Sequence, residues 1–429
     1  METSPPAQAN QDAIRNVERL YRILEAAKLL NSTLDLAELT AIILKIVRDE
    51  VGIERGTVFV TDKRRRQIRS LVAQDLENKD IILPIGQGIA GVVAETGDTI
   101  NIPDAYADPR FDASVDATLG YRTSDIYCMP IVNRIGEIVG VLELLNRTRP
   151  LEEEDEAFLT GVSVHFGLAL ENAQLHRELI EKRRIEQELL LARGIQQNFY
   201  PTIPEAYGGV EISGSSEMCE AVGGDYLGYF PFEDDRRFVV ILGDVSGKGI
   251  GAALVMSSLH AACRALIQRV HALEDITGIL NETFVETTGP GVFVTMLIML
   301  VDPVGKRVHY IRAGHNPALT VTASGQWHLY ERGGDPPVGL FPHVRFLREI
   351  ASVEPGSVVV IYTDGVNEAE NAAHEQFGVE RLADLVVGSR MLSAAQIHGR
   401  IRNALKDFVG DEPIHDDSTL MVLKFPDES

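Results

Sequence analysis

The sequence of 429 residues predicts an α+β domain, a long connecting helix and a second domain built around β-strands. The first part alternates amphipathic helices with short strand-like segments, which is typical of helices packed on an antiparallel sheet. The stretch from residue 152 to 200 has no turn signal and is rich in Glu, Lys, Arg and Leu. The remainder contains short apolar runs, several of which border an aspartate. A chain of this length can hold two or three domains with separate cores.

Composition excludes several classes of partner. The net charge of −23 argues against nucleic acid, because phosphate contacts need a basic surface. The three cysteines, Cys128, Cys219 and Cys263, lack metal-type spacing and are typical of reduced thiols. The first residues do not have the basic and apolar regions of a signal peptide, and the longest apolar run, Val292–Val301, is too short to span a bilayer. We therefore expect a cytoplasmic protein with no membrane partner.

The first domain is predicted over residues 12–165, after a polar tail over residues 1–11 that we expect to be disordered. Apolar residues at helical spacing predict helices over Ala13–Leu30 and Leu36–Val51, and a short helix ends near Gly97. Strands are predicted over Gly56–Thr61, Gln67–Ala73, Ile81–Pro84, Asp98–Ile102, Tyr127–Val132 and Glu137–Leu145. This order indicates an α+β domain with an antiparallel sheet.

Five segments of this domain resemble a GAF domain. They are Gly88-Ile-Ala-Gly91, Asn101–Phe111, Gly120–Thr123, Cys128–Ile131 and Gly140–Asn146. GAF domains are small-ligand sensors, and some of them bind cyclic nucleotides. The resemblance implies a ligand pocket that includes Asp108, Phe111, Asp116 and Thr123.

A partial match to the cyclic-nucleotide subset of GAF domains leaves two interpretations open. Asn146-Arg147 and Asp155-Glu156 fit the motif, whereas Leu151 stands where the subset has Phe. One interpretation is a cyclic-nucleotide site in which Arg147 forms a salt bridge to Asp155. The other, which we favour, is that these polar residues only hold the end of the domain together.

The chain from Glu152 to Tyr200 is predicted to form one long helix, of which residues 166–200 link the domains. Leu168, Leu175 and Leu179 share one heptad seam, and Ile185, Leu189 and Ala192 share a second. The two frames do not join without a stammer. Such a helix is typical of a dimerising coiled coil, so we expect a homodimer, with a packed interdomain helix in a monomer as the alternative.

The stretch from Phe238 to Gly251 organises the second domain. Five apolar residues predict a buried strand that ends at Gly243 and Asp244, before a glycine-rich loop and a helix over Ala252–Val270. The loop does not fit a Walker motif, because Gly249 follows Lys248. It fits the G-x-G-x-x-A dinucleotide pattern, but Asp244 would repel a pyrophosphate. An acid at the end of a buried strand is costly unless a cation offsets its charge.

Four aspartates in the second domain lie at strand ends. They are Asp225, Asp244, Asp364 and Asp416, with Asp417 adjacent to the last. The strands are predicted over Val210–Ser216, Leu227–Phe232, Phe293–Val301, Arg307–Ala313, Ser357–Tyr362 and Leu420–Phe425. If two sheets pack face to face, these ends converge and form a hard-oxygen site suited to Mg²⁺ or Mn²⁺. Each aspartate taken singly would more often be a turn or cap residue.

The last domain is predicted over residues 201–429, and the chain over roughly residues 190–425 resembles the SpoIIE-type branch of the PPM (type 2C) metal-dependent protein serine/threonine phosphatases. The motifs are Ile195-Gln-Gln197, Gly223-Gly-Asp-Tyr226, Gly243-Asp-Val-Ser-Gly-Lys-Gly249, Phe293-Val-Thr295, Ala313-Gly-His-Asn-Pro317, Tyr362-Thr-Asp-Gly365 and Asp416-Asp-Ser-Thr419. The resemblance implies an α/β/β/α sandwich that holds two Mn²⁺ or Mg²⁺ ions. The implied catalytic residues and metal ligands are Asp225, Asp244, Asp364 and Asp416, with the Val245 carbonyl as a further ligand and Asp417 as an outer candidate.

Three positions qualify this resemblance. Gly228 stands where the family often has an acid that could orient water or an extra ion. His315 could act as a general acid, although a structural turn is the favoured interpretation. Arg312 could pair with phosphate, which we regard as the weaker alternative.

The sequence therefore predicts a signalling phosphatase in which a GAF sensor regulates hydrolysis through the helical linker. A hydroxide bridging two ions would attack phosphoserine or phosphothreonine directly. The resemblance implies a phosphorylated regulatory protein as substrate, of the anti-sigma-factor antagonist type. The alternative is a non-catalytic pseudophosphatase that binds its partner in response to a ligand.

Overall fold

The computed structural model describes residues 33–73, 81–113, 116, 121–232, 236–270 and 272–427, and positions 21, 24, 25 and 27–29. The chain divides into two compact units, Met1–Arg184 and Ile185–Ser429. Helix α5, Glu153–Gln197, begins in the first unit and ends in the second. Most of the helix predicted over Ala13–Leu30 lies outside the described residues.

The first unit is built on one antiparallel sheet, as the sequence predicts. Its strand order is β3-β2-β1-β6-β5-β4. The strands are β1 (Ile53–Asp62), β2 (Gln67–Ala73), β3 (Ile82–Pro84), β4 (Ile100–Ile102), β5 (Ile126–Val132) and β6 (Ile138–Arg147). Because side chains alternate along a strand, β6 directs Leu142 to one face and Val141 to the other.

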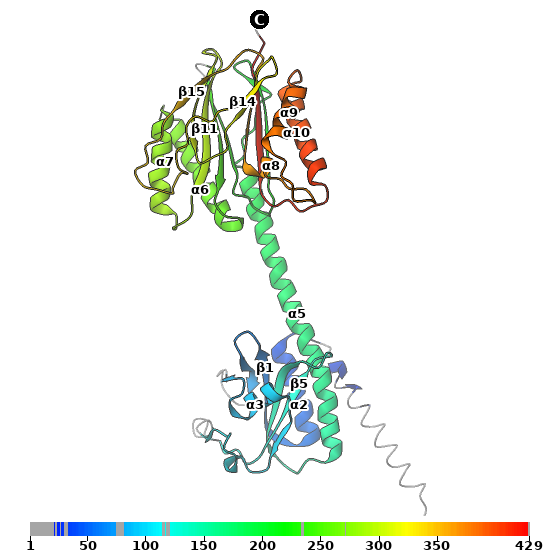
Figure 1. The fold of residues 1–429 in the computed structure, drawn as a ribbon. Coiled ribbons are helices and arrows are strands. Elements are labelled where there is room, and N and C mark those ends of the chain that lie inside the picture. Colours follow the sequence, from blue (N-terminus) through cyan, green and yellow to red (C-terminus); the bar gives the residue numbers. More distant parts are fainter. Residues whose placement is uncertain are drawn as a thin grey trace, which may run out of the picture. The chain divides into compact units, whose positions relative to one another are not determined.

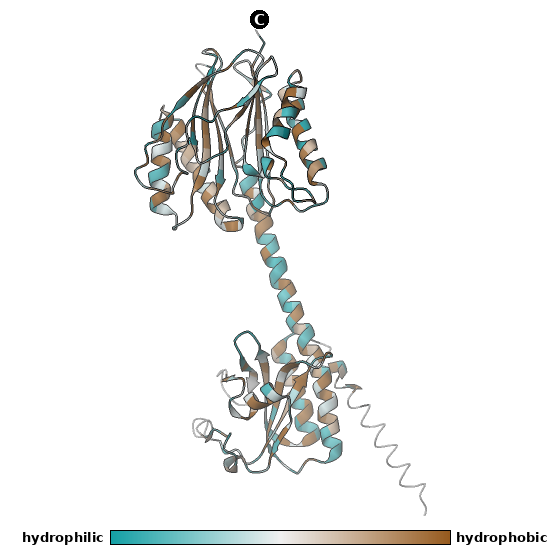
Figure 2. Cartoon of the chain, viewed as in Figure 1, coloured by the Kyte–Doolittle hydropathy of each residue, from teal (hydrophilic) through white to brown (hydrophobic). Residues whose placement is uncertain are grey.

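The two faces of this sheet carry different helices. Helix α2 (Leu36–Val51) packs on one face together with the start of α5, which contributes apolar residues as far as Ala173. The shorter helix α3 (Gly88–Thr96) packs on the opposite face, where a smaller apolar cluster leaves room for a cavity. The sensor core therefore continues past residue 165 along α5. The part of α5 that follows is largely hydrophilic, with isolated hydrophobic residues (Figure 2).

The second unit contains two antiparallel sheets. One has the order β15-β12-β11-β10-β9, and the other has the order β14-β13-β16-β17-β8-β7. The first comprises β9 (Tyr226–Pro231), β10 (Phe238–Val245), β11 (Val294–Asp302), β12 (Arg307–Ala313) and β15 (Glu349–Ser352). The second comprises β7 (Ala206–Tyr207), β8 (Val210–Glu217), β13 (Leu319–Val321), β14 (Trp327–Leu329), β16 (Val358–Tyr362) and β17 (Ser418–Lys424).

The two sheets pack face to face, and helices cover both outer faces (Figure 1). Helices α6 (Gly249–Ile267) and α7 (Leu273–Thr287) pack on the first sheet. Helices α9 (Val379–Ser389) and α10 (Ala394–Val409) pack on the second, and the one-turn helix α8 (Asp364–Asn367) follows β16. This four-layer arrangement confirms the predicted α/β/β/α sandwich.

Two details of the second unit differ from the sequence prediction. Strand β10 continues through Asp244 to Val245, because pairing with β11 extends to Val245↔Val294. The sequence interpretation also missed α7, α9 and α10, although Ser393 and Gln396 form a capping box at the start of α10.

Within the described part of the chain, α6 is long and apolar enough to cross a membrane by length and composition alone. Its fully buried residues Met256, Leu259 and Cys263 pack toward the first sheet. Burial in this core accounts for part of the apolar character of the helix, whereas Ile250 and Leu254 are exposed.

Candidate active site

The predicted aspartates come from four strands that meet at one end of the sandwich. Asp244 lies near the end of β10, and Asp225 immediately precedes the antiparallel neighbour β9. In the other sheet, Asp364 follows β16, and Asp416 and Asp417 precede its antiparallel neighbour β17. The end of β10 and the start of β9 therefore face the end of β16 and the start of β17.

The period-two alternation of strands aims several of these side chains into the space between the sheets. Asp244 shares the face of Val240 and Leu242, which belong to the inter-sheet core. By the same parity, Asp225 shares the face of Leu227, and Asp417 shares the face of Met421. The aspartates thus continue the two inner faces where the apolar core ends.

Charges in this cluster act on one another. Burial, followed by the charges of Asp364, Asp416 and Asp417, raises the pKa of Asp244 to about 7. Burial and then the charge of Asp244 hold the pKa of Asp225 well above its usual value. The pKa of Asp364 is raised by burial and then by Asp416. For Asp225, Asp244 and Asp364, burial is therefore the larger cause of the raised pKa, and the charges of neighbouring aspartates add to it.

Asp225 is held by two threonines of the opposite sheet. The hydroxyl groups of Thr363 and Thr419 donate hydrogen bonds to its Oδ2 atom, at 2.8 and 2.6 Å. Thr363 directly follows β16 and Thr419 lies in β17, so these bonds join the two sheets. The side chain of Asp225 is fully buried, and its orientation is therefore fixed.

Asp416 and Asp417 have different surroundings although they are neighbours in sequence. Asp417 accepts hydrogen bonds from the backbone amides of Cys219 and Gly224, at 2.8 and 2.7 Å. Asp416 is more exposed and forms a salt bridge with Lys248 at 3.0 Å. The arrangement favours Asp416 as the ion ligand and gives Asp417 the role of holding the loop before β9.

The donor set fits a divalent cation in its chemistry, although the side chains are not arranged as a closed ligand cage. Among the described residues, no group of three or more His, Cys, Asp or Glu side chains is close enough to hold an ion as they stand. Lys248 pairs with Asp416, and its charge also acts on Asp244 and Asp364. Oxygen ligands of this kind, without nitrogen or sulfur, suit Mg²⁺ or Mn²⁺.

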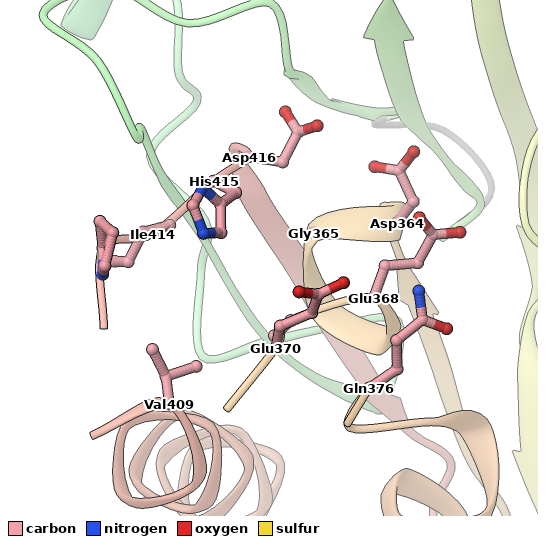
Figure 3. Close-up of a pocket in the computed structure, with 11 residues that line it drawn as sticks. Asp364, Gly365, Glu368, Glu370, Gln376, Val409, Ile414, His415 and Asp416 are labelled. Atoms are coloured by element: carbon pink, nitrogen blue, oxygen red, sulfur yellow. The ribbon is translucent and has the colours of Figure 1, made fainter. Parts of the chain in front are cut away.

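A cavity of about 390 Å³ opens beside two of these aspartates (Figure 3). Asp364 and Asp416 line it together with Glu368, Glu370 and His415, and the side chain of Glu368 lies next to that of Asp364. The sequence interpretation missed the two glutamates, because nothing in the local pattern distinguishes them from solvated acids. The cavity can admit a substrate side chain next to Asp364 and Asp416.

His315 and Arg312 make structural contacts. His315 is 4% exposed, and its Nδ1 atom lies 2.9 Å from the hydroxyl oxygen of Thr295. Arg312 donates hydrogen bonds to the backbone carbonyls of His315, Glu331 and Gly333. Burial lowers the pKa of His315 to about 4, so the ring is neutral at physiological pH. These contacts favour the structural-turn interpretation of His315 and leave Arg312 occupied by carbonyl groups.

The first unit has its own cavity, of about 260 Å³, between α3 and the sheet. Three of the four predicted pocket residues, Phe111, Asp116 and Thr123, line it. Buried Asp116 accepts hydrogen bonds from the amide and the hydroxyl of Thr123, at 2.6 and 2.9 Å. Asp108 does not line the cavity, and its carboxylate pairs with Arg110 at 2.7 Å.

The sequence did not single out Glu143, which contributes a carboxyl group to the floor of this cavity. The floor residues on β1, β5 and β6 are Thr57, Phe59, Ile126, Glu143 and Leu145. Burial raises the pKa of Glu143 to about 7. The start of α3 also lines the cavity, and no side chain caps this helix end. The cavity therefore offers backbone N–H groups at one place and a carboxyl group at another.

The cyclic-nucleotide interpretation predicted a salt bridge between Arg147 and Asp155, and this prediction is wrong. Arg147 pairs with Asp125, which precedes β5. Asp155 pairs with Arg149, whose Nη2 atom lies 2.9 Å from Oδ1. Asn146 accepts a hydrogen bond from the amide of Ser124 at 2.7 Å. The contacts support the interpretation that these residues hold the end of the domain together.

Comparison with known families agrees with both resemblances. The GAF domain family matches residues 35–170, and the family described as Stage II sporulation protein E (SpoIIE) matches residues 234–426. The chain joins a GAF domain to a SpoIIE-type PPM phosphatase domain. The predicted enzyme class, a protein serine/threonine phosphatase, is thereby confirmed at the level of the family, and PPM phosphatases depend on Mg²⁺ or Mn²⁺.

Curated relatives share only part of the chain. The dual 3',5'-cyclic-AMP and -GMP phosphodiesterase 11A of Takifugu rubripes is 36% identical over 167 residues, which are 35% of this chain and 18% of the relative. The cGMP-specific 3',5'-cyclic phosphodiesterase of Drosophila melanogaster is 41% identical over 121 residues, 27% of this chain and 11% of the relative. The chain thus spans less than a fifth of the length of these relatives.

A solved structure supports the fold of the phosphatase domain. The SiaA-PP2C domain of Pseudomonas aeruginosa aligns with a TM-score of 0.51 at 19% identity, and the alignment covers 57% of this chain and 98% of that domain.

Gly228, where the family often has an acid, lies in a closely packed part of β9. A Cβ atom at this position would come within 2.9 Å of both the ring of Phe230 and the hydroxyl of Tyr226. An acid at 228 would require both aromatic side chains to move. The glycine therefore belongs to the local packing of β9.

Proposed function

We propose that this protein is a metal-dependent serine/threonine phosphatase of cytoplasmic signalling whose activity responds to the GAF domain. The observation that carries this proposal is the meeting of Asp244, Asp364 and Asp416 at one end of the sandwich, where burial and then the charges of Asp364 and Asp416 raise the pKa of Asp244. A bound divalent cation would offset the charge of such a cluster without requiring its carboxyl groups to be protonated. The matched family supplies the reaction class.

The resemblance to the SpoIIE-type phosphatases suggests which residues would hold two ions. Asp225 and the Val245 carbonyl would hold one ion, Asp364 and Asp416 the other, and Asp244 would serve both. When bound, Mg²⁺ or Mn²⁺ supplies an activated water nucleophile and neutralises the charge of the phosphoryl group. The protein's own part is positioning, because Thr363 and Thr419 fix Asp225.

The test is hydrolysis of an aryl phosphate and of a phosphoserine protein by the full chain, with and without Mn²⁺. We expect Mn²⁺-dependent turnover that Asp244→Asn abolishes. The matched control is Asp384→Asn, which neutralises an exposed aspartate on α9. A chain that binds a phosphoprotein but does not hydrolyse either substrate at saturating Mn²⁺ would be a pseudophosphatase, and this result overturns the proposal.

The proposed substrate is a phosphorylated regulatory protein of the anti-sigma-factor antagonist type. The support is the resemblance to SpoIIE-type phosphatases. The cavity beside Asp364 and Asp416 has room for a phosphorylated side chain. Dephosphorylation of such an antagonist by the wild type, and its loss in Asp244→Asn, tests the assignment.

The proposed ligand of the GAF domain is a cyclic nucleotide, with another small molecule as the alternative. Two observations favour the cyclic nucleotide. The curated relatives are named for cyclic AMP and cyclic GMP, and the uncapped start of α3 can bind an anion. Calorimetry of the full chain with cyclic mononucleotides and dinucleotides decides between them, since absence of heat with every one of these compounds leaves the alternative.

The helix α5 is proposed to dimerise and to transmit the state of the sensor. Beyond the sensor core it exposes large apolar side chains, at Leu175, Leu179, Ile180, Ile185, Leu190, Leu191 and Ile195. Two heptad frames compete along this stretch, which makes the helix a candidate two-state element. Sedimentation of the full chain should show a dimer, and a monomer at micromolar concentration would contradict this part of the proposal.

A further inference from the structure

The end of α5 is bonded directly to the loop that carries Asp225. We propose that Gln196 and Tyr200 are positioning residues through which α5 sets the place of Asp225 and hence the affinity of the site for its metal ions. The inference rests on the proposed phosphatase function. It concerns a contact within the second unit, at residues that the reaction itself does not use.

Gln196 clamps both backbone groups of one residue in this loop. Its Nε2 atom donates a hydrogen bond to the carbonyl of Gly223 at 2.6 Å, and its Oε1 atom accepts one from the amide of Gly223 at 3.0 Å. Only a side-chain amide has a neutral donor and acceptor arranged for this double contact. Gln196 is 3% exposed, so water does not compete for these bonds.

Tyr200 makes a second contact two residues further along the loop. Its hydroxyl donates to the backbone carbonyl of Asp225 at 3.1 Å and accepts from the hydroxyl of Ser216 at 3.3 Å. Burial raises the pKa of Tyr200 further above its usual value, so the hydroxyl keeps its proton. Asp225 is thus held at its carbonyl by the end of the linker and at its carboxylate by Thr363 and Thr419.

The loop between these two contacts is closely packed. A Cβ atom on Gly223 would lie 2.5 Å from the Oδ2 atom of Asp417, and one on Gly224 would lie 3.3 Å from the carbonyl of Val245. Gly224 also donates to Asp417. A shift of Gly223 therefore displaces Asp225 relative to Asp417 and to the carbonyl of Val245. The proposed function assigns Asp225 and the Val245 carbonyl to the same ion.

The contacts of Gln196 and Tyr200 with this loop, which we call the clamp, differ from a second possible route, in which the linker would act through α6 on the loop after Asp244. Where the end of α5 faces α6, the residues are mainly apolar and include Ile195, Ile250 and Leu254, and they surround a groove of about 320 Å³. The polar and directional contacts described for α5 lead to Gly223 and Asp225 instead. Rotation of α5 would break these bonds, because hydrogen bonds weaken steeply when misaligned.

The experiment measures Mn²⁺ affinity in the metal-free full chain by titration calorimetry, and compares Gln196→Ala with Gln197→Ala. Gln197 is the exposed neighbour on the same helix and serves as the control. Thermal unfolding of the metal-free proteins monitors folding, and turnover of an aryl phosphate against Mn²⁺ concentration separates metal affinity from kcat. Removing a residue that orients a metal ligand typically weakens metal binding by about 10–100-fold.

We expect Gln196→Ala to weaken Mn²⁺ binding by about tenfold or more while kcat at saturating Mn²⁺ is largely retained, and Gln197→Ala to behave as wild type. A folded Gln196→Ala protein with wild-type Mn²⁺ affinity would refute the proposal that the clamp sets the affinity of the site for metal. If that variant does not fold, Tyr200→Phe removes one hydroxyl only and should weaken Mn²⁺ binding severalfold, and unchanged affinity in this variant also overturns the clamp.

A last outcome separates the clamp from the function on which it rests. If the wild type itself binds no Mn²⁺, the proposed metal-dependent function fails, and the clamp as a determinant of metal affinity fails with it. If the wild type binds Mn²⁺ and only the Gln196 and Tyr200 variants are unaffected, the function stands and the clamp alone is refuted.

Discussion

Replacing Glu143 by Gln should stabilise the GAF domain more at high pH than at low pH. Glu143 lies on the floor of the sensor cavity, where burial raises its pKa from 4.5 to about 7. Because each pKa unit corresponds to about 1.4 kcal/mol, the ionised carboxylate destabilises the folded domain by up to about 3 kcal/mol. Gln has nearly the same shape and no charge, so Glu143→Gln removes this penalty.

The sign of the pH dependence follows from the raised pKa. The folded state binds the proton more tightly than the unfolded state, so stability is highest below the unfolded pKa of 4.5 and falls as pH rises through about 7. The penalty is about 1 kcal/mol at pH 5 and about 3 kcal/mol at pH 8. Burial of the uncharged amide offsets part of the gain, so we expect Glu143→Gln to gain about 1–3 kcal/mol at pH 8 and little at pH 5.

Hydrogen exchange of the full chain, followed by mass spectrometry of peptides from β6, reports the stability of this domain separately. Glu137→Gln is the matched control, because Glu137 is exposed in the turn before β6 and pairs with Lys63 on the surface. Its effect should be small at both pH values, as surface ion pairs contribute about 0–1 kcal/mol. If wild type and Glu143→Gln lose protection in parallel between pH 5 and pH 8, Glu143 does not titrate as its burial requires.

The remaining predictions concern the catalytic end, the linker and the sensor boundary. Asp244→Asn should abolish Mn²⁺-dependent turnover and leave the metal-free melting temperature unchanged or higher, and near-wild-type turnover at saturating Mn²⁺ would refute the assignment. Inserting two residues after Glu181 should rotate the rest of α5 by about 200° and uncouple the phosphatase rate from the sensor ligand, whereas inserting seven residues should roughly restore the helical phase. Equal phosphatase rates in the two insertion variants would exclude the rotation model. Asp155→Ala should break the pair with Arg149 and lower stability by about 1 kcal/mol without changing ligand affinity, and a selective affinity loss in calorimetry would contradict this.

Many helices and strands of both domains could be predicted from the sequence, because they depend on interactions between residues that are close together in the chain. Helix α2 has the bounds predicted from its apolar spacing, because Asp35 caps its start and Gly52 adopts the left-handed conformation at its end. The strands of the GAF sheet and β8, β9, β16 and β17 lie within a few residues of their predicted positions. These features depend on neighbours in the chain, and a pattern of neighbours is what a sequence displays directly.

Tertiary contacts decided how individual polar side chains are used. Asp416 and Asp417 are indistinguishable by sequence, yet Asp417 bonds to the amide of Gly224, which lies 193 residues away in the chain. Asp125 and Asp155 carry the same charge and are both close to Arg147 in the sequence, but in the folded chain Arg147 pairs with Asp125. Nothing in the motif Ile195-Gln-Gln197 says that Gln196 is the buried residue that clamps Gly223.

The physical reason for this division is the range of the interactions. Periodicity and capping involve residues within one or two helical turns, so a single sequence contains the complete information. A hydrogen bond or an ion pair forms only where two groups approach within about 3–4 Å, and for residues on different strands that distance is set by the packing of the two sheets. The sequence therefore determined the domains, their order and the acids available for metal binding, while the folded chain determined which acids remain available to a metal ion and which residues hold them in place.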